Sequence, residues 1–122
     1  MRNLAIGALI AAIAATPAAA MDVATFLVKV DALKSKGPFA VISGDYKPLM
    51  TEIDSSAKAL RTERLAAVAA GARPAYCPEG RGGLSPNDIF GGMHAIPAAQ
   101  QPQIQVKDAL RAVYAKKYPC PT

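Results

Sequence analysis

Apolar and polar residues alternate with helical spacing over most of the chain beyond residue 20. Between residues 23 and 36 an apolar side chain recurs every three or four positions, the pattern of one face of an amphipathic α-helix. Asp22 is placed to cap this helix, and Gly37 with Pro38 ends it. The stripe that we expect to face the core consists of Val23, Phe26, Leu27, Val30 and Leu33.

A short apolar run follows at residues 39–42, and its length fits either a strand or a helical turn. A single strand has no partner in this sequence, so we expect a helical turn. Ser43 or Asp45 can cap a second, longer helix, which accepts a proline in its first turn. We expect this helix to run to Ala70 and to stop at Gly71. Its expected inward stripe is Leu49, Ile53, Ala57, Leu60 and Val68.

Residues 72–84 are rich in proline and glycine and are predicted to form a long loop. Ser85 is then the expected N-cap of a third helix, with a proline at its first position. Asp88 follows at the third position, where a carboxylate suits the helix dipole. We expect this helix to end near Ile96, just before Pro97.

The third helix contains two consecutive glycines, Gly91 and Gly92. Each weakens a helix by about 1 kcal/mol relative to alanine, unless close packing against another backbone compensates. Residues 98–105 are a polar linker, and residues 106–118 are the last predicted helix. Its expected inward positions are Val106, Leu110, Val113 and Tyr114. The pattern therefore predicts an all-α fold, a small single domain of about four helices.

The first twenty residues have a different pattern. A single positive charge, Arg2, precedes an apolar stretch at residues 4–15, and Ala18, Ala19 and Ala20 supply the small residues that signal peptidase accepts. These features predict a signal peptide over residues 1–20, cleaved between Ala20 and Met21, and a periplasmic or secreted domain of residues 21–122. Two alternatives are an uncleaved membrane anchor, for which the run is short and mostly alanine, and a translation start at Met21.

The domain contains two cysteines, Cys77 and Cys120. An even number of cysteines in an oxidising compartment predicts a single disulfide between them. The chain-entropy model gives such a bond about 4 kcal/mol of stability as an upper value. The alternative of a zinc site is disfavoured, because two thiols with His94 do not supply four ligands. We expect no metal and no cofactor.

The chain carries 14 basic and 9 acidic side chains, a net charge of +5 with its histidine neutral. The basic residues are scattered along the sequence, which favours solvated helix faces over a nucleic-acid site. Arg81 lies among glycines, but the Gly-Lys-Ser/Thr ending of a phosphate-binding loop is absent. The positive balance favours an acidic partner through the rate of encounter.

Catalytic groups are sparse. His94 is the only histidine and the only candidate for a conventional general base. Both cysteines are assigned to the disulfide, and the neighbouring carboxylates of Glu52 and Asp54 point in different directions on a helix. We therefore expect a protein that is not an enzyme, with a hydrolase built around His94 as an alternative.

The second half of the chain resembles the Tai and Rap immunity proteins. The resemblance rests on Cys77-Pro-Glu, the Ser-Pro-Asn-Asp helix start, Pro97 and the last helix closing in Tyr118-Pro-Cys120, and it covers residues 77–120. Members of that family are small exported helical proteins that bind and block peptidoglycan amidase effectors of type VI secretion. The resemblance transfers no effector-contacting residue to this chain.

The resemblance implies an exported, non-enzymatic binding protein with a protein partner in the cell envelope, an amidase effector in the first instance. A small periplasmic stress or chaperone-like envelope factor is the alternative function. The sequence predicts neither a nucleic-acid partner nor a stable membrane anchor after cleavage. A homo-oligomer stays open.

Overall fold

The structure is a computed structural model that describes residues 20–122. The predicted signal peptide lies outside the described residues, apart from Ala20 at its end. The described part is helical, and its only β-type pairing is an isolated antiparallel bridge between Asp22 and Gln105. The all-α prediction is thus confirmed. The elements are α1 (Val23–Lys34), η1 (Gly37–Ile42), α2 (Tyr46–Ala69), α3 (Pro86–His94), η2 (Gln101–Gln103) and α4 (Val106–Lys117), where η1 and η2 are 3₁₀ helices.

Helix α1 begins where the sequence predicts, because the Asp22 carboxylate accepts hydrogen bonds from the backbone N–H of Thr25 and from its hydroxyl, both at 2.8 Å. The whole predicted stripe of α1 is buried. The helix start is also tied to the linker before α4. The Val23 N–H donates to the carbonyl of Ile104 at 2.8 Å, and the Val106 N–H donates to that of Met21 at 2.9 Å.

Helix α2 ends at Ala69 in a motif that its glycine makes possible. Gly71 has φ +72°, its N–H donates to the Val68 carbonyl, and the Ala72 N–H reaches back to the Ala67 carbonyl at 2.9 Å. These are the two hydrogen bonds of a Schellman motif. The prediction that Val68 faces the core is wrong, because its side chain is 57% exposed.

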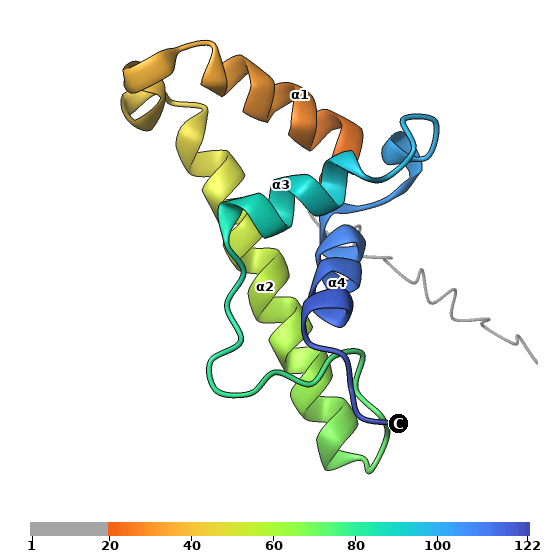
Figure 1. Cartoon of the computed structure of the whole chain (residues 1–122). Coiled ribbons are helices and arrows are strands. Elements are labelled where there is room, and N and C mark those ends of the chain that lie inside the picture. The colour runs from red at the N-terminus through yellow and green to blue at the C-terminus, as the bar shows by residue number, and fades with distance from the viewer. Residues whose placement is uncertain (1–19) are drawn as a thin grey trace, which may run out of the picture.

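The start of α2 differs from the prediction in its capping. Asp45 occupies the N-cap position, but its side chain makes no capping hydrogen bond. Its carboxylate instead accepts a hydrogen bond from the Lys36 ammonium at 3.0 Å. The predicted helical turn at residues 39–42 is confirmed as part of η1, which leaves Phe39, Val41 and Ile42 exposed at a corner of the molecule (Figure 1).

The core is formed by the inward side chains of α1, α2, α3 and α4 (Figure 1), together with Tyr76 of the loop after α2. Helix α4 packs against both α2 and α3, and α1 contacts α2, α4 and both 3₁₀ helices. The largest fully buried side chains are Phe26, Leu60, Met93, Leu110, Val23 and Val106. Among residues 20–122 no helix has the length and apolar character that a membrane span requires.

Helix α3 packs against α4 at Gly92. A Cβ atom built at Gly92 would collide with the side chain of Val113, whereas one at Gly91 would meet nothing within 4 Å. Close packing, the condition under which a helical glycine is compensated, is therefore found at one glycine of the pair, and it is made against a side chain and not against a backbone. Helix α3 ends at His94, two residues before the predicted Ile96.

Candidate functional site

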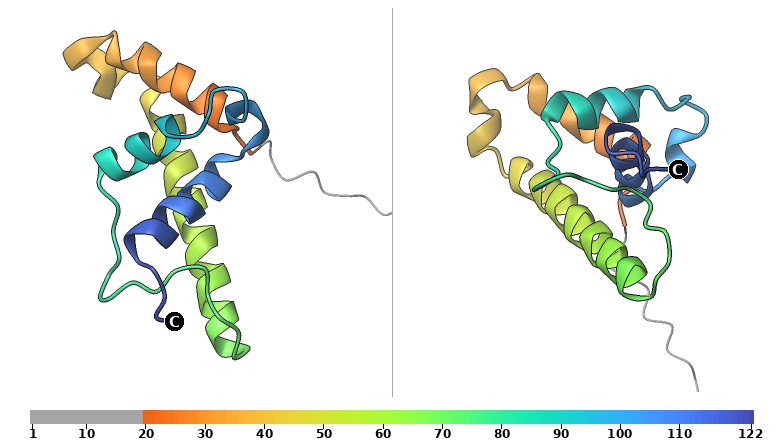
Figure 2. Two further views of the ribbon diagram at one scale, coloured as in Figure 1. Left: turned by 45° about the vertical axis from the view of Figure 1, so that its right-hand side comes forward. Right: turned by 60° about the horizontal axis from the view of Figure 1, so that its bottom comes forward.

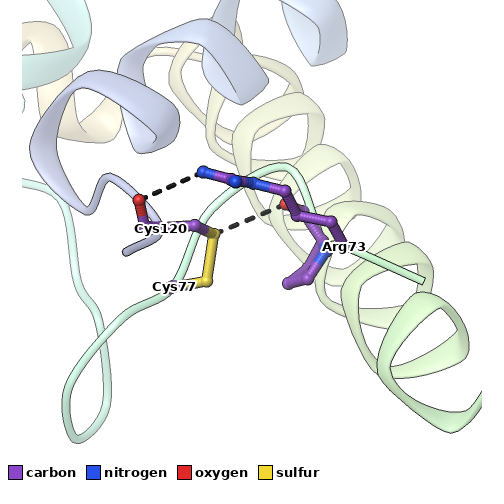
Figure 3. Close-up of a disulfide and its surroundings, with 4 residues drawn as sticks. Arg73, Cys77 and Cys120 are labelled. Atoms are coloured by element: carbon purple, nitrogen blue, oxygen red, sulfur yellow. Dashed lines mark hydrogen bonds between the residues drawn. A yellow bond between two sulfur atoms is a disulfide. The ribbon is translucent and has the colours of Figure 1, made fainter. Parts of the chain in front are cut away.

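The loop between α2 and α3, residues 70–85, crosses the end of α4 and is fastened there (Figure 2). Cys77 on this loop forms a disulfide with Cys120, three residues beyond α4, with the two Cα atoms 4.8 Å apart (Figure 3). The two cysteines thus lie together as the sequence predicted. The Arg73 guanidinium adds a hydrogen bond to the Cys120 carbonyl at 3.2 Å.

Two further contacts hold the loop against the chain end. The Cys77 N–H donates to the Tyr118 carbonyl at 2.8 Å, and the Tyr118 hydroxyl donates to the Gly83 carbonyl at 2.6 Å. Between these points the chain turns tightly at Gly82, where φ is +60° and a side chain would run into Pro78. The loop is therefore anchored on both sides of this turn.

An open cleft of about 610 Å³ lies between this loop, α2 and α4. The loop supplies one wall, one face of α2 supplies the other, and a single side chain of α4 contributes. The lining residues are Ala57, Lys58, Arg61 and Arg64 from α2, Tyr76, Pro78, Gly80, Arg81 and Gly82 from the loop, and Tyr114 from α4. The lining therefore contains four cationic side chains and no carboxylate.

Two tyrosines pack against each other in this cleft. The ring centroids of Tyr76 and Tyr114 are 4.6 Å apart with 20° between the planes, a stacked arrangement. Tyr76 is 4% exposed, and it belongs to the core cluster although it comes from the loop. Burial is the main reason why the pKa of the Tyr114 hydroxyl is raised above its ordinary value, so this group stays neutral.

The cationic residues of α2 share one face because they are spaced three apart, at Lys58, Arg61 and Arg64. Arg81 faces them from the loop. The Arg64 guanidinium carbon lies 5.5 Å from the centroid of the Tyr76 ring, a cation–π contact. The Arg64 Nε atom is buried and has no hydrogen-bond partner within the described residues. None of these four side chains takes part in an ion pair in residues 20–122.

One carboxylate of α2 beside the cleft, that of Glu63, is already engaged. Glu63 lines a smaller adjoining cavity of about 180 Å³, which Arg64 also lines. Its carboxylate binds the Lys107 ammonium and the Arg111 guanidinium, the latter at 2.9 Å, and these hydrogen bonds lower the pKa of Glu63. The charge of Glu63 is thus neutralised from α4, and Arg64 forms no ion pair among residues 20–122.

The structure gathers charges that the sequence presents as scattered. Arg81 lies in a glycine-rich segment without the ending of a phosphate-binding loop, yet it lines the cleft together with the basic face of α2. The spacing of Lys58, Arg61 and Arg64 indicates from the sequence alone that these cations lie on one helix face, because residues three apart are neighbours on a helix. No sequence pattern indicates the position of Arg81, since that position depends on the path of the loop between α2 and α3.

The other candidate residues lie apart from the cleft. His94 is exposed at the end of α3, and Glu52 and Asp54 lie on α2 outside the lining. Within the described range no three His, Cys, Asp or Glu side chains are grouped as metal ligands would be. Cationic groups beside buried tyrosines suit the binding of an anion. Comparison of the chain with models of known families, with curated proteins and with solved structures found no match.

Proposed function

We propose that this chain is a non-enzymatic binding protein of the cell envelope that inhibits a peptidoglycan amidase effector, in the manner of the immunity proteins it resembles. The observation that carries the proposal is the open cleft, in which tyrosines and arginines lie between a disulfide-anchored loop and α2. Tyrosine and arginine are among the residue types enriched where protein interfaces concentrate their binding energy. The disulfide is compatible with an exported chain.

The test is protection of a host cell. Peptidoglycan amidases, including any encoded beside this gene, are directed to the periplasm with and without co-expression of the full chain. We expect one of them to lyse cells alone, to be tolerated with the chain present, and to co-purify with it in stoichiometric amount. Lysis by every amidase regardless of the chain, with no stable complex, would contradict the proposal.

A matched pair of charge reversals asks whether the cleft is the contact surface. The double variant Arg61→Glu/Arg81→Glu reverses two charges at exposed positions of the cleft, and Lys29→Glu/Lys47→Glu makes the same change in net charge at exposed positions outside the lining. We expect the first variant to lose protection and the second to keep it. Equal protection by both would place the contact surface elsewhere.

A further inference from the structure

We infer that the cleft is a carboxylate-recognition site that receives an extended acidic segment of the partner protein, with Arg64 as the central anchor. The inference deepens the proposed function, since it names the chemistry by which the partner is held. It starts from an imbalance: the cleft places four cationic side chains around one space and no acidic side chain among them. Like charges gathered in this way repel one another, and a bound anion relieves that repulsion.

Arg64 is the best-organised of the four. Its guanidinium lies against the ring of Tyr76, which is itself buried against Tyr114. Its Nε atom is removed from water without a protein acceptor in the described residues, and such an unsatisfied donor is costly. An arginine fork whose position is fixed before binding pairs with a carboxylate through two parallel hydrogen bonds.

The arrangement of the cations favours an extended ligand over a single compact anion. Lys58 and Arg64 are six residues apart on α2, about 9 Å along the helix axis. Side chains on one face of an extended peptide recur about every 7 Å, so acidic residues at two alternate positions fit within this span and can pair with different cations. Ala57, Pro78 and the half-buried Tyr114 offer apolar surface to the methylene groups next to those carboxylates.

The same geometry disfavours a nucleic acid. Single-stranded nucleic acids gain affinity by stacking bases on exposed aromatic faces. The Tyr76 ring is covered by Tyr114 and by Arg64 and is 4% exposed, so it offers no face to a base. We therefore assign the site to peptide carboxylates and treat phosphate as an outcome of the test.

The test uses the oxidised full chain and isothermal titration calorimetry. The probe is a short peptide with glutamate at alternate positions. It is compared with the same peptide carrying glutamine and with inorganic phosphate. The glutamate peptide is also titrated in the presence of added chloride, with the ionic strength held equal in all titrations. We expect saturable 1:1 binding of the glutamate peptide alone. Equal binding of the glutamine peptide, tighter binding of phosphate, or binding that chloride removes entirely would overturn the inference.

Variants locate the site. Arg64→Ala is expected to weaken the glutamate peptide by roughly tenfold or more, the equivalent of one charge-assisted hydrogen bond. Arg64→Lys keeps the charge but loses the planar fork, so it recovers only part of the affinity. Removal of Arg64 also uncovers Tyr76, so a second variant is needed at an exposed position. Arg81→Ala is that variant, because Arg81 is exposed and lines the cleft. Lys47→Ala, at an exposed position outside the lining, is the control. Unchanged affinity in both arginine-to-alanine variants would refute the site.

A spectroscopic readout follows Arg64 itself. The peptide should shift the ¹⁵N–¹H resonance of the Arg64 Nε group, and an unperturbed resonance at saturation would contradict its role as anchor.

Failure of this inference is distinguishable from failure of the proposed function. Amidase inhibition without glutamate-peptide binding would overturn the inference alone, whereas peptide binding by a chain that protects against no amidase would overturn the function alone.

Discussion

Gly91 and Gly92 are neighbours in the sequence, but their surroundings differ. Gly92 approaches Val113 of α4 so closely that a Cβ atom has no room, while Gly91 is exposed with open space around it. Both glycines weaken α3 by the conformational freedom that they lose on folding. Only Gly92 compensates for this cost, by allowing α3 and α4 to pack closely.

Alanine at each position separates these two effects. Gly92→Ala is expected to destabilise the fold by about 1–2 kcal/mol, because overpacking outweighs the gain in helix propensity. Gly91→Ala serves as the control and should stabilise the fold by up to about 1 kcal/mol. Urea unfolding measures both, and adding Val113→Ala to Gly92→Ala should restore part of the loss. Equal effects of the two alanines would show that no close contact exists at Gly92.

At the scale of the elements, the start of α3 is fixed twice. The Ser85 hydroxyl accepts a hydrogen bond from the Asp88 N–H at 3.1 Å, and the Asp88 carboxylate accepts one from the Ser85 N–H at 2.8 Å, forming a capping box. The same carboxylate binds the Lys117 ammonium at 2.6 Å, at the end of α4. Asp88 therefore caps one helix and ties it to another.

This double role makes stability depend on pH. The Lys117 ammonium first, and then the hydrogen bonds from Ser85, lower the pKa of Asp88 from 3.8 to about 2. The stabilisation is fully present above the unfolded value near 3.8 and is lost as the pH falls through about 2. We expect urea midpoints of the wild-type protein and Asp88→Asn to differ at pH 6 and to converge near pH 2.

The control for this titration is Asp54→Asn, which removes an exposed carboxylate of α2 that makes no ion pair among the described residues. Its curve should run parallel to that of the wild type over the same range. A constant difference between wild type and Asp88→Asn from pH 6 to pH 2 would show that the charge of Asp88 does not stabilise the fold.

At the scale of the whole molecule, the disulfide anchors a loop that contributes both to the core and to the cleft. It closes the chain between residues 77 and 120, and it places Tyr76 in the core while Arg81 lines the cleft. The loop has no regular secondary structure of its own, and it is held by contacts to the segment after α4. The stability of the fold and the lining of the cleft therefore depend on the same cross-link.

Cys77→Ser/Cys120→Ser is expected to lower the free energy of unfolding by about 2–4 kcal/mol, since the unfolded chain regains the entropy of an open loop. Denaturant unfolding measures this loss. Reduction of the wild-type protein should produce a comparable loss, and the double variant, which has no bond to reduce, should not respond to reductant. Coincident unfolding midpoints for oxidised and reduced wild-type protein would contradict the prediction.

Local patterns predicted most features of the helices but not the cleft. The stripe of α1 and the capping role of Ser85 were predicted correctly because both depend on residues within a few positions of each other. Val68 was placed on the wrong side because helical periodicity does not show where the neighbouring helices end. The loss of Asp45 as a cap follows from its contact with Lys36, nine residues away.

The sequence by itself determined the helical class, the main helix starts and the one pair of cysteines available for a cross-link. These features follow from residue spacing and from the chemistry of single side chains. The tertiary structure alone decided that Tyr76 of a loop enters the core and that Arg81 joins the basic face of α2. The physical reason is that both depend on the path of a proline- and glycine-rich loop, which is set by its distant anchors at Tyr118 and Cys120.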